Sequence, residues 1–255
     1  MRYCRFKHQG VARYGVIHGD EVVALAGAPW VSSSETGPGV PLAAAELLPP
    51  TEASKIVAVG QNYRKHAEEL GKPVPPEPLL FIKPATALNA HAQPILLPPD
   101  SAEVHHESEL ALVIGHRIKD ADEAQAAKAI FALTCFNDVT ARDIQRREVQ
   151  HTRAKSYDTF ACAGPWMETE LSPAHLRVVC RVNGQVRQDG RTSDMIFPPA
   201  RLVSFISRIM TLLPGDLVST GTPSGVGPLR DGDLVEVEIE GIGILANPVT
   251  LARST

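Results

Sequence analysis

The sequence predicts a β-rich α+β fold with a curled or barrel-like sheet and a small β unit at its start. Many short runs have the composition of strands, and only a few segments have helical periodicity. The run 233–243 alternates apolar and polar residues, and the run 177–188 carries Asn183-Gly184, a pair typical of tight hairpin turns. A chain of 255 residues is long enough for one large domain, or for one domain and a smaller one.

The first fifty residues indicate a small N-terminal β domain. Two short β-type runs flank His18-Gly19-Asp20, which is a hairpin signal. Serine, glycine and proline residues are then frequent between 32 and 50, and they indicate turns and a linker. We therefore expect a boundary near residue 50, with domains over 1–50 and 51–255.

A short polar helix is expected to follow the buried strand 55–60. It covers 62–72, with Asn62 as its N-cap and Gly71 at its end. The next residues, 73–78, read PVPPEP and cannot form regular structure. A short polar helix beside such a segment is a good candidate for a mobile flap.

Longer helices and further strands complete the larger domain. Thr140 and Asp143 fit a capping box at the start of one of these helices. The helices are expected over 119–133, 141–149 and 199–213, and the strands over 105–115, 134–139, 177–188, 216–220 and 233–243.

Composition excludes several classes of protein. The 25 basic and 29 acidic residues give a net charge of −4, which predicts neither a nucleic-acid nor a membrane partner. Apolar runs are about as long as strands and too short to span a bilayer, and the first ten residues do not resemble a secretory signal. The four cysteines form no CxxC pair and no catalytic motif, so we expect reduced thiols and a cytoplasmic protein.

Two acids at the start of an apolar strand are the main functional signal. Residues 105–115 read HHESELALVIG, so Glu107 and Glu109 share one face of the expected strand. Strand geometry places them roughly 7 Å apart, where like charges repel each other. The run EVEIE at 236–240 has the same spacing, but there the alternate residues are apolar, which is typical of a strand with one solvated face.

Two observations favour a metal site over a second solvated row. The strand beyond Glu109 is apolar on both faces, and a third acid, Asp138, ends another apolar run. Three carboxylates at strand ends suit a hard cation, Mg²⁺, Mn²⁺ or Ca²⁺, which would offset their repulsion. A pair of acids also occurs in glycosidases, but only 5% of the chain is aromatic, whereas sugar sites usually stack sugars on aromatic rings.

Other polar residues have both a functional and a structural interpretation. His66 and Glu69 share one face of the short helix, so His66 is either a surface histidine or a general base oriented by Glu69. Arg142 lies in the first turn of a helix, where a cation is disfavoured, which indicates either an anionic ligand or a salt bridge to Asp143 or Glu148. Gln145 follows Arg142 by three residues, so the two share one face of that helix and could bind the same ligand.

Two further features stay equally open. Lys155 is either a surface lysine or a charge that stabilises a carboxylate or enolate. The loop GTPSGVG at 221–227 lacks the lysine of a phosphate loop, and it is either a plain turn or a nest of amides for a carboxylate.

Taken together, these motifs resemble the fumarylacetoacetate hydrolase family, most closely its acylpyruvase and oxaloacetate-decarboxylase branch. The resemblance extends in order over residues 55–248. The matching segments are GQNYRKHAEELG, EPLLFIKP, HHESELALVIG, NDVTARDIQ, RAKSYDTF, VNGQVRQDGRTSDMIF and LLPGDLVSTGTPSGVGPLRDGD.

The resemblance implies a mixed β-roll catalytic core after a small N-terminal domain, usually in a homodimer. It implies Glu107, Glu109 and Asp138 as metal ligands, and His66 with Glu69 as a dyad on a lid that activates water. Lys155 would stabilise developing charge. Substrate contacts would come from Arg142, Gln145, Gly221 and Thr222, with Tyr63 and Lys83 in less defined roles. His151 departs from the family, where a tryptophan often precedes TRAK.

The family's substrates are small-molecule 2-oxo acids with a second carbonyl or carboxylate. Metal-dependent hydrolysis or lysis of a C–C bond in an acylpyruvate-like acid is the first expectation, because the His66–Glu69 pair is intact and isomerase relatives often lack it. Isomerisation or tautomerisation of unsaturated 2-hydroxy or 2-oxo dicarboxylates is the alternative. A non-catalytic binder of metal and dicarboxylate is a third interpretation.

Overall fold

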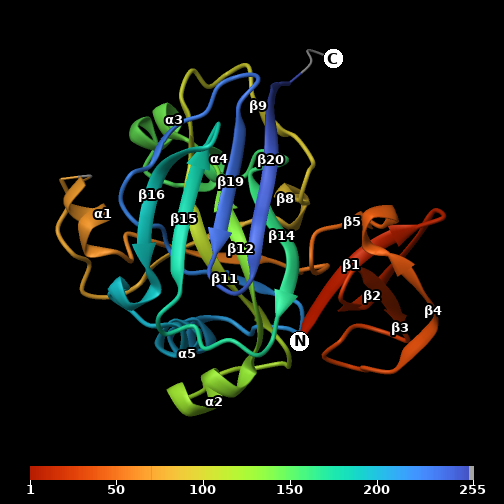
Figure 1. Cartoon of the computed structure of the whole chain (residues 1–255). Helices are drawn as coiled ribbons and strands as arrows, with labels where there is room; N and C mark the ends of the chain where they lie inside the picture. The colour runs from red at the N-terminus through yellow and green to blue at the C-terminus, as the bar shows by residue number, and fades with distance from the viewer. Residues whose placement is uncertain (70, 253–255) are drawn as a thin grey trace.

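A large mixed sheet is the framework of the molecule (Figure 1). The computed structural model describes residues 1–69 and 71–252. The strands of this sheet are β1 (Arg2–His8), β2 (Val11–His18), β3 (Glu21–Leu25), β4 (Glu35–Pro41), β5 (Glu46–Leu47), β6 (Ile56–Gly60), β7 (Leu79–Lys83), β8 (Leu88–Asn89), β11 (Ser108–Ile114), β12 (Ile130–Asp138), β14 (Ala161–Glu168) and β17 (Leu217–Ser219). Their main order is β4-β3-β2-β1-β14-β12-β11-β17-β6-β7. The predicted β-rich α+β class is therefore confirmed.

A second sheet packs against the centre of the first. Its strands are β9 (Ile95–Leu97), β15 (Arg177–Val182), β16 (Gln185–Arg191), β19 (Leu234–Ile239) and β20 (Gly243–Leu251), in the order β16-β15-β19-β20-β9. One apolar cluster joins the sheets and includes Leu110 and Leu112 of β11, Val178 of β15 and Val237 of β19. Each fully buried aliphatic side chain of this kind contributes about 1.5–3 kcal/mol, so this layer holds β11 rigidly in place.

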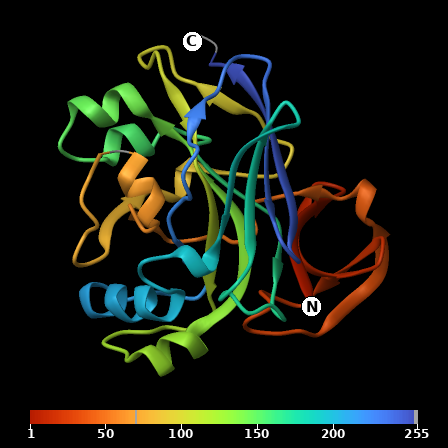
Figure 2. The same ribbon diagram turned by 60° about the vertical axis from the view of Figure 1, so that its left-hand side comes forward.

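A small third sheet and the helices surround this core. The sheet consists of β13 (Thr140–Ala141), β10 (Val104–His106) and β18 (Gly227–Pro228). The helices are α1 (Arg64–Glu69), α2 (Glu123–Ala129), α3 (Arg142–Arg147), α4 (Thr152–Lys155) and α5 (Pro199–Ile209), with 3-10 turns at Leu42–Ala44, Ala85–Ala87 and Thr192–Asp194. In both views α1 and α3 lie on the side away from β1–β5 (Figures 1 and 2). No helix among the described residues has the length and apolar character needed to cross a bilayer.

The N-terminal strands extend the large sheet through a short junction. β1 pairs with β14 at Arg2↔Glu168 and Tyr3↔Met167. The Glu168 carboxylate accepts hydrogen bonds from the Met1 ammonium at 2.8 Å and from Arg2 Nε at 3.3 Å. Beyond this junction β1–β3 have an apolar cluster of their own, which contains Cys4, Phe6, Val22 and Ala24.

Several local predictions are confirmed. The β15–β16 hairpin turns at Asn183 and Gly184, whose φ values are 53° and 75°, as a turn with two left-handed residues requires. The β2–β3 hairpin turns at Gly19-Asp20. Along β19 Val235, Val237 and Ile239 are buried and alternate with partly exposed residues, as the sequence predicted.

The helix expected over 119–133 is shorter than predicted. It spans Glu123–Ala129, and Asp122 caps it by accepting a bond from the Gln125 N–H at 2.8 Å. The residues from Ile130 onward belong to β12 instead, because pairing with β11 outweighs their helical periodicity.

Two predicted helix caps are wrong. No side chain caps α3: the Thr140 hydroxyl donates to the Asp138 carbonyl at 2.8 Å, and the Asp143 carboxylate accepts from the Ser101 hydroxyl at 2.7 Å. Asn62 does not cap α1, because its side-chain amide bonds the main chain of Phe197 and Thr220. The predicted end of α1 is right, since Gly71 has a φ of 65°.

Candidate active site

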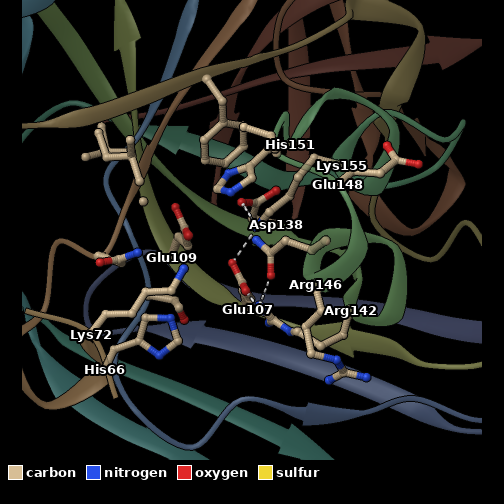
Figure 3. A pocket seen from close by; sticks show the side chains of 18 residues that line it. His66, Lys72, Glu107, Glu109, Asp138, Arg142, Arg146, Glu148, His151 and Lys155 are labelled. Atoms are coloured by element: carbon tan, nitrogen blue, oxygen red, sulfur yellow. Dashed lines mark hydrogen bonds and ion pairs between the residues drawn. The ribbon is translucent and has the colours of Figure 1, made fainter. Parts of the chain in front are cut away.

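Three carboxylates converge where β11 and β12 meet. Glu109 lies in β11, Glu107 directly precedes that strand, and Asp138 ends β12. The Asp138 N–H donates to the Glu107 carbonyl at 2.9 Å, so the antiparallel pairing itself brings these acids side by side. One oxygen from each acid lies within 4.8 Å of the others, and all three residues are buried. Figure 3 shows them converging on one cavity.

Basic side chains balance two of the three acids. The Lys155 ammonium bonds Glu107 at 2.7 Å and Asp138 at 2.6 Å, and Lys83 bonds Asp138 at 2.5 Å. Arg142 pairs with Glu107. Burial by itself opposes ionisation, but Lys155 and Arg142 outweigh it and lower the pKa of Glu107. Likewise burial would lower the pKa of Lys155, but Asp138 and Glu107 outweigh it and raise that pKa.

Of the three acids, Glu109 is the one without a basic partner in the part of the chain that the structure describes. It accepts hydrogen bonds from the Ser219 hydroxyl and, at 2.8 Å, from the Gly221 N–H. Burial, followed by the charges of Asp138 and Glu107, raises the pKa of Glu109 well above its usual value. A buried carboxylate that faces two others and has no cation of its own fits a divalent metal ligand, and the all-oxygen donor set fits a hard ion.

His66 and Glu69 form a hydrogen-bonded pair beside the acids. The His66 Nδ1 lies 3.0 Å from the Glu69 carboxylate, which also accepts the Gly225 N–H at 2.9 Å. Because a carboxylate accepts, Nδ1 carries the proton and Nε2 is the basic nitrogen. His66 is buried and lines the same cavity as the acids, so the geometry fits a base oriented by its neighbour.

The cavity has a volume of about 460 Å³ and contains most of the predicted site residues. Predicted residues in its lining are His66, Glu107, Glu109, Asp138, Arg142, Gln145, Lys155 and Thr222. Arg142 Nη1 donates to Gln145 at 2.6 Å, which places both on one side of the cavity. Arg142 is also paired with Glu107, and not with Asp143 or Glu148, the salt-bridge partners expected from the sequence.

Four predicted residues lie behind the lining. Glu69 contacts His66, and Lys83 is buried behind Asp138. Gly221 donates its N–H to Glu109, a candidate metal ligand, so this N–H is already paired within the protein. Tyr63 is buried with an unpartnered hydroxyl, and burial together with Glu109 raises its pKa. The Thr222 hydroxyl, though at the cavity, donates to Ser108 at 2.9 Å and accepts from Gln188 at 2.7 Å.

The outer lining contains residues that sequence analysis did not single out. They are Val59, Gly60, Gln61, Lys72, Leu79, Phe81, Arg146, Glu148 and Val149, in addition to His151, which was noted only as a departure from the family. Gly60, Gln61, Leu79 and Phe81 lie within segments that resemble the family, but their residue types carry no chemical signal, and only the fold brings all these residues to one cavity. Lys72 was the most accessible to inference, since it follows the glycine that ends the short helix.

A family model described as the C-terminal part of fumarylacetoacetate (FAA) hydrolase matches residues 55–250. The chain belongs to the fumarylacetoacetate hydrolase family. A second model, Rv2993c-like, N-terminal, matches residues 1–50.

Relatives within the fumarylacetoacetate hydrolase family have several activities in their names. A structure of 5-carboxymethyl-2-hydroxymuconate delta-isomerase from Mycobacterium smegmatis is 45% identical, with a TM-score of 0.93 over 99% of this chain and 100% of that one. A 2-hydroxyhepta-2,4-diene-1,7-dioate isomerase from Mycobacterium marinum is 44% identical, with a TM-score of 0.92 over all of both chains. A mitochondrial oxaloacetate tautomerase of Bos taurus is 42% identical over 80% of this chain and 68% of its own length.

Proposed function

We propose that this chain is a divalent-metal-dependent isomerase or tautomerase of small 2-oxo dicarboxylic acids. The observation that carries the proposal is the single cavity in which an oriented imidazole, His66, faces three convergent carboxylates. The names of the similar isomerases and tautomerase, all of which concern 2-oxo or 2-hydroxy acids with a second carboxylate, support it.

The inner end of the cavity would bind the reacting end of the substrate. Glu107, Glu109 and Asp138 would hold Mg²⁺, or else Mn²⁺ or Ca²⁺. The bound ion would supply positive charge that polarises the 2-oxo group and stabilises an enolate. Arg142 and Lys155 add fixed positive charge at the same place, where it attracts the 2-oxo carboxylate.

His66 would carry the proton between two positions of the substrate. Its Nε2 accepts a proton from the carbon beside the ketone and returns it to a different carbon or to the enolate oxygen, so that no atom is gained or lost. Glu69 keeps the imidazole in the required tautomer and stabilises its protonated form. Isomerisation therefore needs no residue beyond those already at the cavity.

Hydrolysis or lysis of a C–C bond in an acylpyruvate-like acid is the second candidate. The intact His66–Glu69 pair favours it, because the same imidazole would activate a water molecule that attacks the distal carbonyl. Oxaloacetate decarboxylation belongs to the same candidate, since it also leaves an enolate, although it needs no attacking water.

Ultraviolet absorbance of enol forms distinguishes these reactions. Purified protein with Mg²⁺ would be mixed with enol oxaloacetate, with an acylpyruvate and with an unsaturated dioate. We expect the enol band to shift or decay without release of a new acid. Decay with release of a new acid or of CO₂ would instead favour the second candidate. No change in any band, despite thermal stabilisation by the metal, would overturn both and leave a non-catalytic binder.

A His66→Ala substitution tests the proposed base. We expect turnover to fall by about 10²–10⁴-fold, because general acid–base catalysis contributes that much, while Mg²⁺ still stabilises the protein against heat. The matched control is His175→Ala, since His175 is exposed and does not line the cavity. Normal turnover in the His66 variant would remove this residue from the mechanism.

Three expectations from the sequence stay predictions. They are the homodimer, the division into domains near residue 50 and the cytoplasmic location. Light scattering during gel filtration would measure the first, and limited proteolysis around residue 50 would measure the second.

A further inference from the structure

Basic side chains around the cavity differ in whether a carboxylate faces them. The lysine and arginine residues in its lining are Lys72, Arg142, Arg146 and Lys155. Lys155 and Arg142 are paired with the buried acids, and Arg146 is paired with Glu103. Within residues 1–69 and 71–252, the Lys72 ammonium forms no ion pair and no hydrogen bond. The cavity therefore contains one lysine whose charge the described part of the protein leaves unbalanced.

The base of this lysine is fixed although its ammonium is not paired. The Lys72 N–H donates to the Ala67 carbonyl at 2.9 Å, directly after Gly71 ends α1. Figure 3 shows the Lys72 side chain entering the cavity from the same side as His66. Lys72 is exposed at the mouth of the cavity, so its ammonium is free to give a charge-assisted hydrogen bond to an anionic group of a ligand bound there.

His151 provides a hydrogen-bond donor on another wall of the cavity. It precedes α4, and its ring meets the Phe81 ring edge-on, with centroids 5.4 Å apart and planes at 72°. Neither of its ring nitrogens has a hydrogen-bond partner within the described part of the chain. Burial, then the charges of Lys155 and Lys72, lower the pKa of His151, so at neutral pH it is an uncharged imidazole with one N–H to donate.

We propose that Lys72 and His151 bind the second carboxylate of the substrate and thereby determine specificity for dicarboxylic 2-oxo acids. This inference rests on the proposed function. It adds the residues that bind the substrate carboxylate remote from the reacting ketone. A neutral tail would leave the Lys72 charge without a partner in the filled cavity, whereas a carboxylate would receive a charge-assisted hydrogen bond.

The charges at the inner end leave this task to the outer residues. Lys83, Lys155 and Arg142 already face Glu107 and Asp138, and they would attract the 2-oxo carboxylate together with the metal. A second carboxylate therefore needs a separate cation. Among the lysine and arginine residues in the described lining, Lys72 alone has no carboxylate partner.

Binding of this carboxylate would also position the base. Lys72 lies six residues after His66 in the chain, and Glu69 attaches the helix that carries His66 to Gly225. A substrate held by Lys72 would fix the segment that carries His66, so a diacid would gain in kcat as well as in KM.

A matched pair of substrates tests the assignment. Oxaloacetate and its 4-methyl ester have the same carbon skeleton and differ in the charge of the remote carboxyl group. For Lys72→Met we expect kcat/KM for enol oxaloacetate to fall about tenfold to a hundredfold, and that for the ester to change by less than about threefold. His151→Phe, which preserves the ring contact, should cost the diacid about threefold to tenfold. Lys72→Arg should retain the preference.

Controls separate this subsite from general damage. Lys65→Met removes a lysine of α1 that is exposed and does not line the cavity, and it should change neither substrate. Equal losses for diacid and ester in Lys72→Met would overturn the assignment.

A binding measurement separates it from failure of the proposed reaction. Calorimetry on the Mg²⁺-loaded protein would compare N-oxalylglycine, an unreactive 2-oxo diacid analogue, with its glycine methyl ester. We expect tighter binding of the diacid to the native chain and loss of that difference in Lys72→Met. If the difference is found but no substrate is turned over, the subsite stands and the proposed reaction fails. If turnover is found without the difference, the subsite is wrong.

Discussion

Two strands of this protein have acids at the same spacing and use them differently. Glu107 and Glu109, at the start of β11, are 5% and 1% exposed. Lys155 contacts Glu107, and the N–H of Gly221 contacts Glu109. Glu238 on β19 is 39% exposed in its side chain and pairs with Arg181 on the neighbouring strand. Both rows follow from the two-residue period of a strand.

The difference comes from what lies opposite each acid. β19 buries alternate residues only, so its acids remain in contact with water, where their charges are screened. β11 is buried at every position, and its partner β12 adds Asp138 to the same place. Spacing therefore identifies a strand face, whereas burial and a third acid from another strand identify a candidate metal site.

The largest contrast should come from removing one acid of each row. In Glu109→Ala we expect Mg²⁺ to lose its stabilising effect on unfolding and turnover to fall by about 10²–10³-fold or more, because the donor set is incomplete. In Glu238→Ala the free energy of unfolding should change by less than about 1 kcal/mol, and turnover should be unaffected. Thermal unfolding with and without Mg²⁺, together with the enol assay, measures both. Metal-dependent stabilisation that persists in Glu109→Ala would show that the ion does not need this acid.

Removing one basic partner of each row of acids should give a smaller contrast, in the free energy of unfolding. Lys155→Met leaves Glu107 and Asp138 buried with less compensation, and we expect a loss of about 3–5 kcal/mol in the unfolding free energy of the metal-free protein. Arg181→Met removes the exposed partner of Glu238 and should cost less than about 1 kcal/mol. Urea unfolding of both variants provides the comparison. Similar losses in the two would mean that the acid cluster tolerates unpaired charge as well as the surface does.

Sequence reasoning reached the inner part of the site for physical reasons. Glu109 and Asp138 lie next to apolar runs that predict buried strands. Burying a carboxylate costs free energy unless a positive charge or a hydrogen bond compensates it, so the sequence alone marks these two residues as unusual. The hairpin at Asn183-Gly184 was equally readable, because both turn residues adopt positive φ.

The outer part of the site was not readable in this way. Lys72 lies outside the segments that resemble the family, and Phe81 lies within one of them without a chemical signal of its own; only the fold places both at the cavity. The caps failed because Asn62 bonds the main chain of Thr220, which only the tertiary fold brings near, and because Thr140 bonds the main chain of Asp138, two residues before it. Local rules thus predicted the residues with a local conflict and missed those whose role arises from the fold.

Glu168 is intermediate between the two rows, and it should give the smallest effect. Its side chain is 9% exposed, but the Met1 ammonium and Arg2 that pair with it are about half exposed. Burial by itself would raise the pKa of Glu168, but the Met1 ammonium, the Glu170 N–H and Arg2 outweigh it and lower the pKa below the usual 4.5. A lowered pKa means that this carboxylate stabilises the fold above pH 4.5 and loses that contribution as the pH falls through its folded pKa.

At pH 7, Glu168→Gln should therefore reduce the free energy of unfolding by about 0.5–1 kcal/mol. The difference from the native chain should shrink as the pH falls below 4.5 and through the folded pKa, as urea titrations at pH 7 and at a series of acid pH values would measure. A difference that stays constant with pH would mean that the junction between β1 and β14 depends on packing and main-chain pairing, and that Glu168, unlike Glu109, contributes little through its charge.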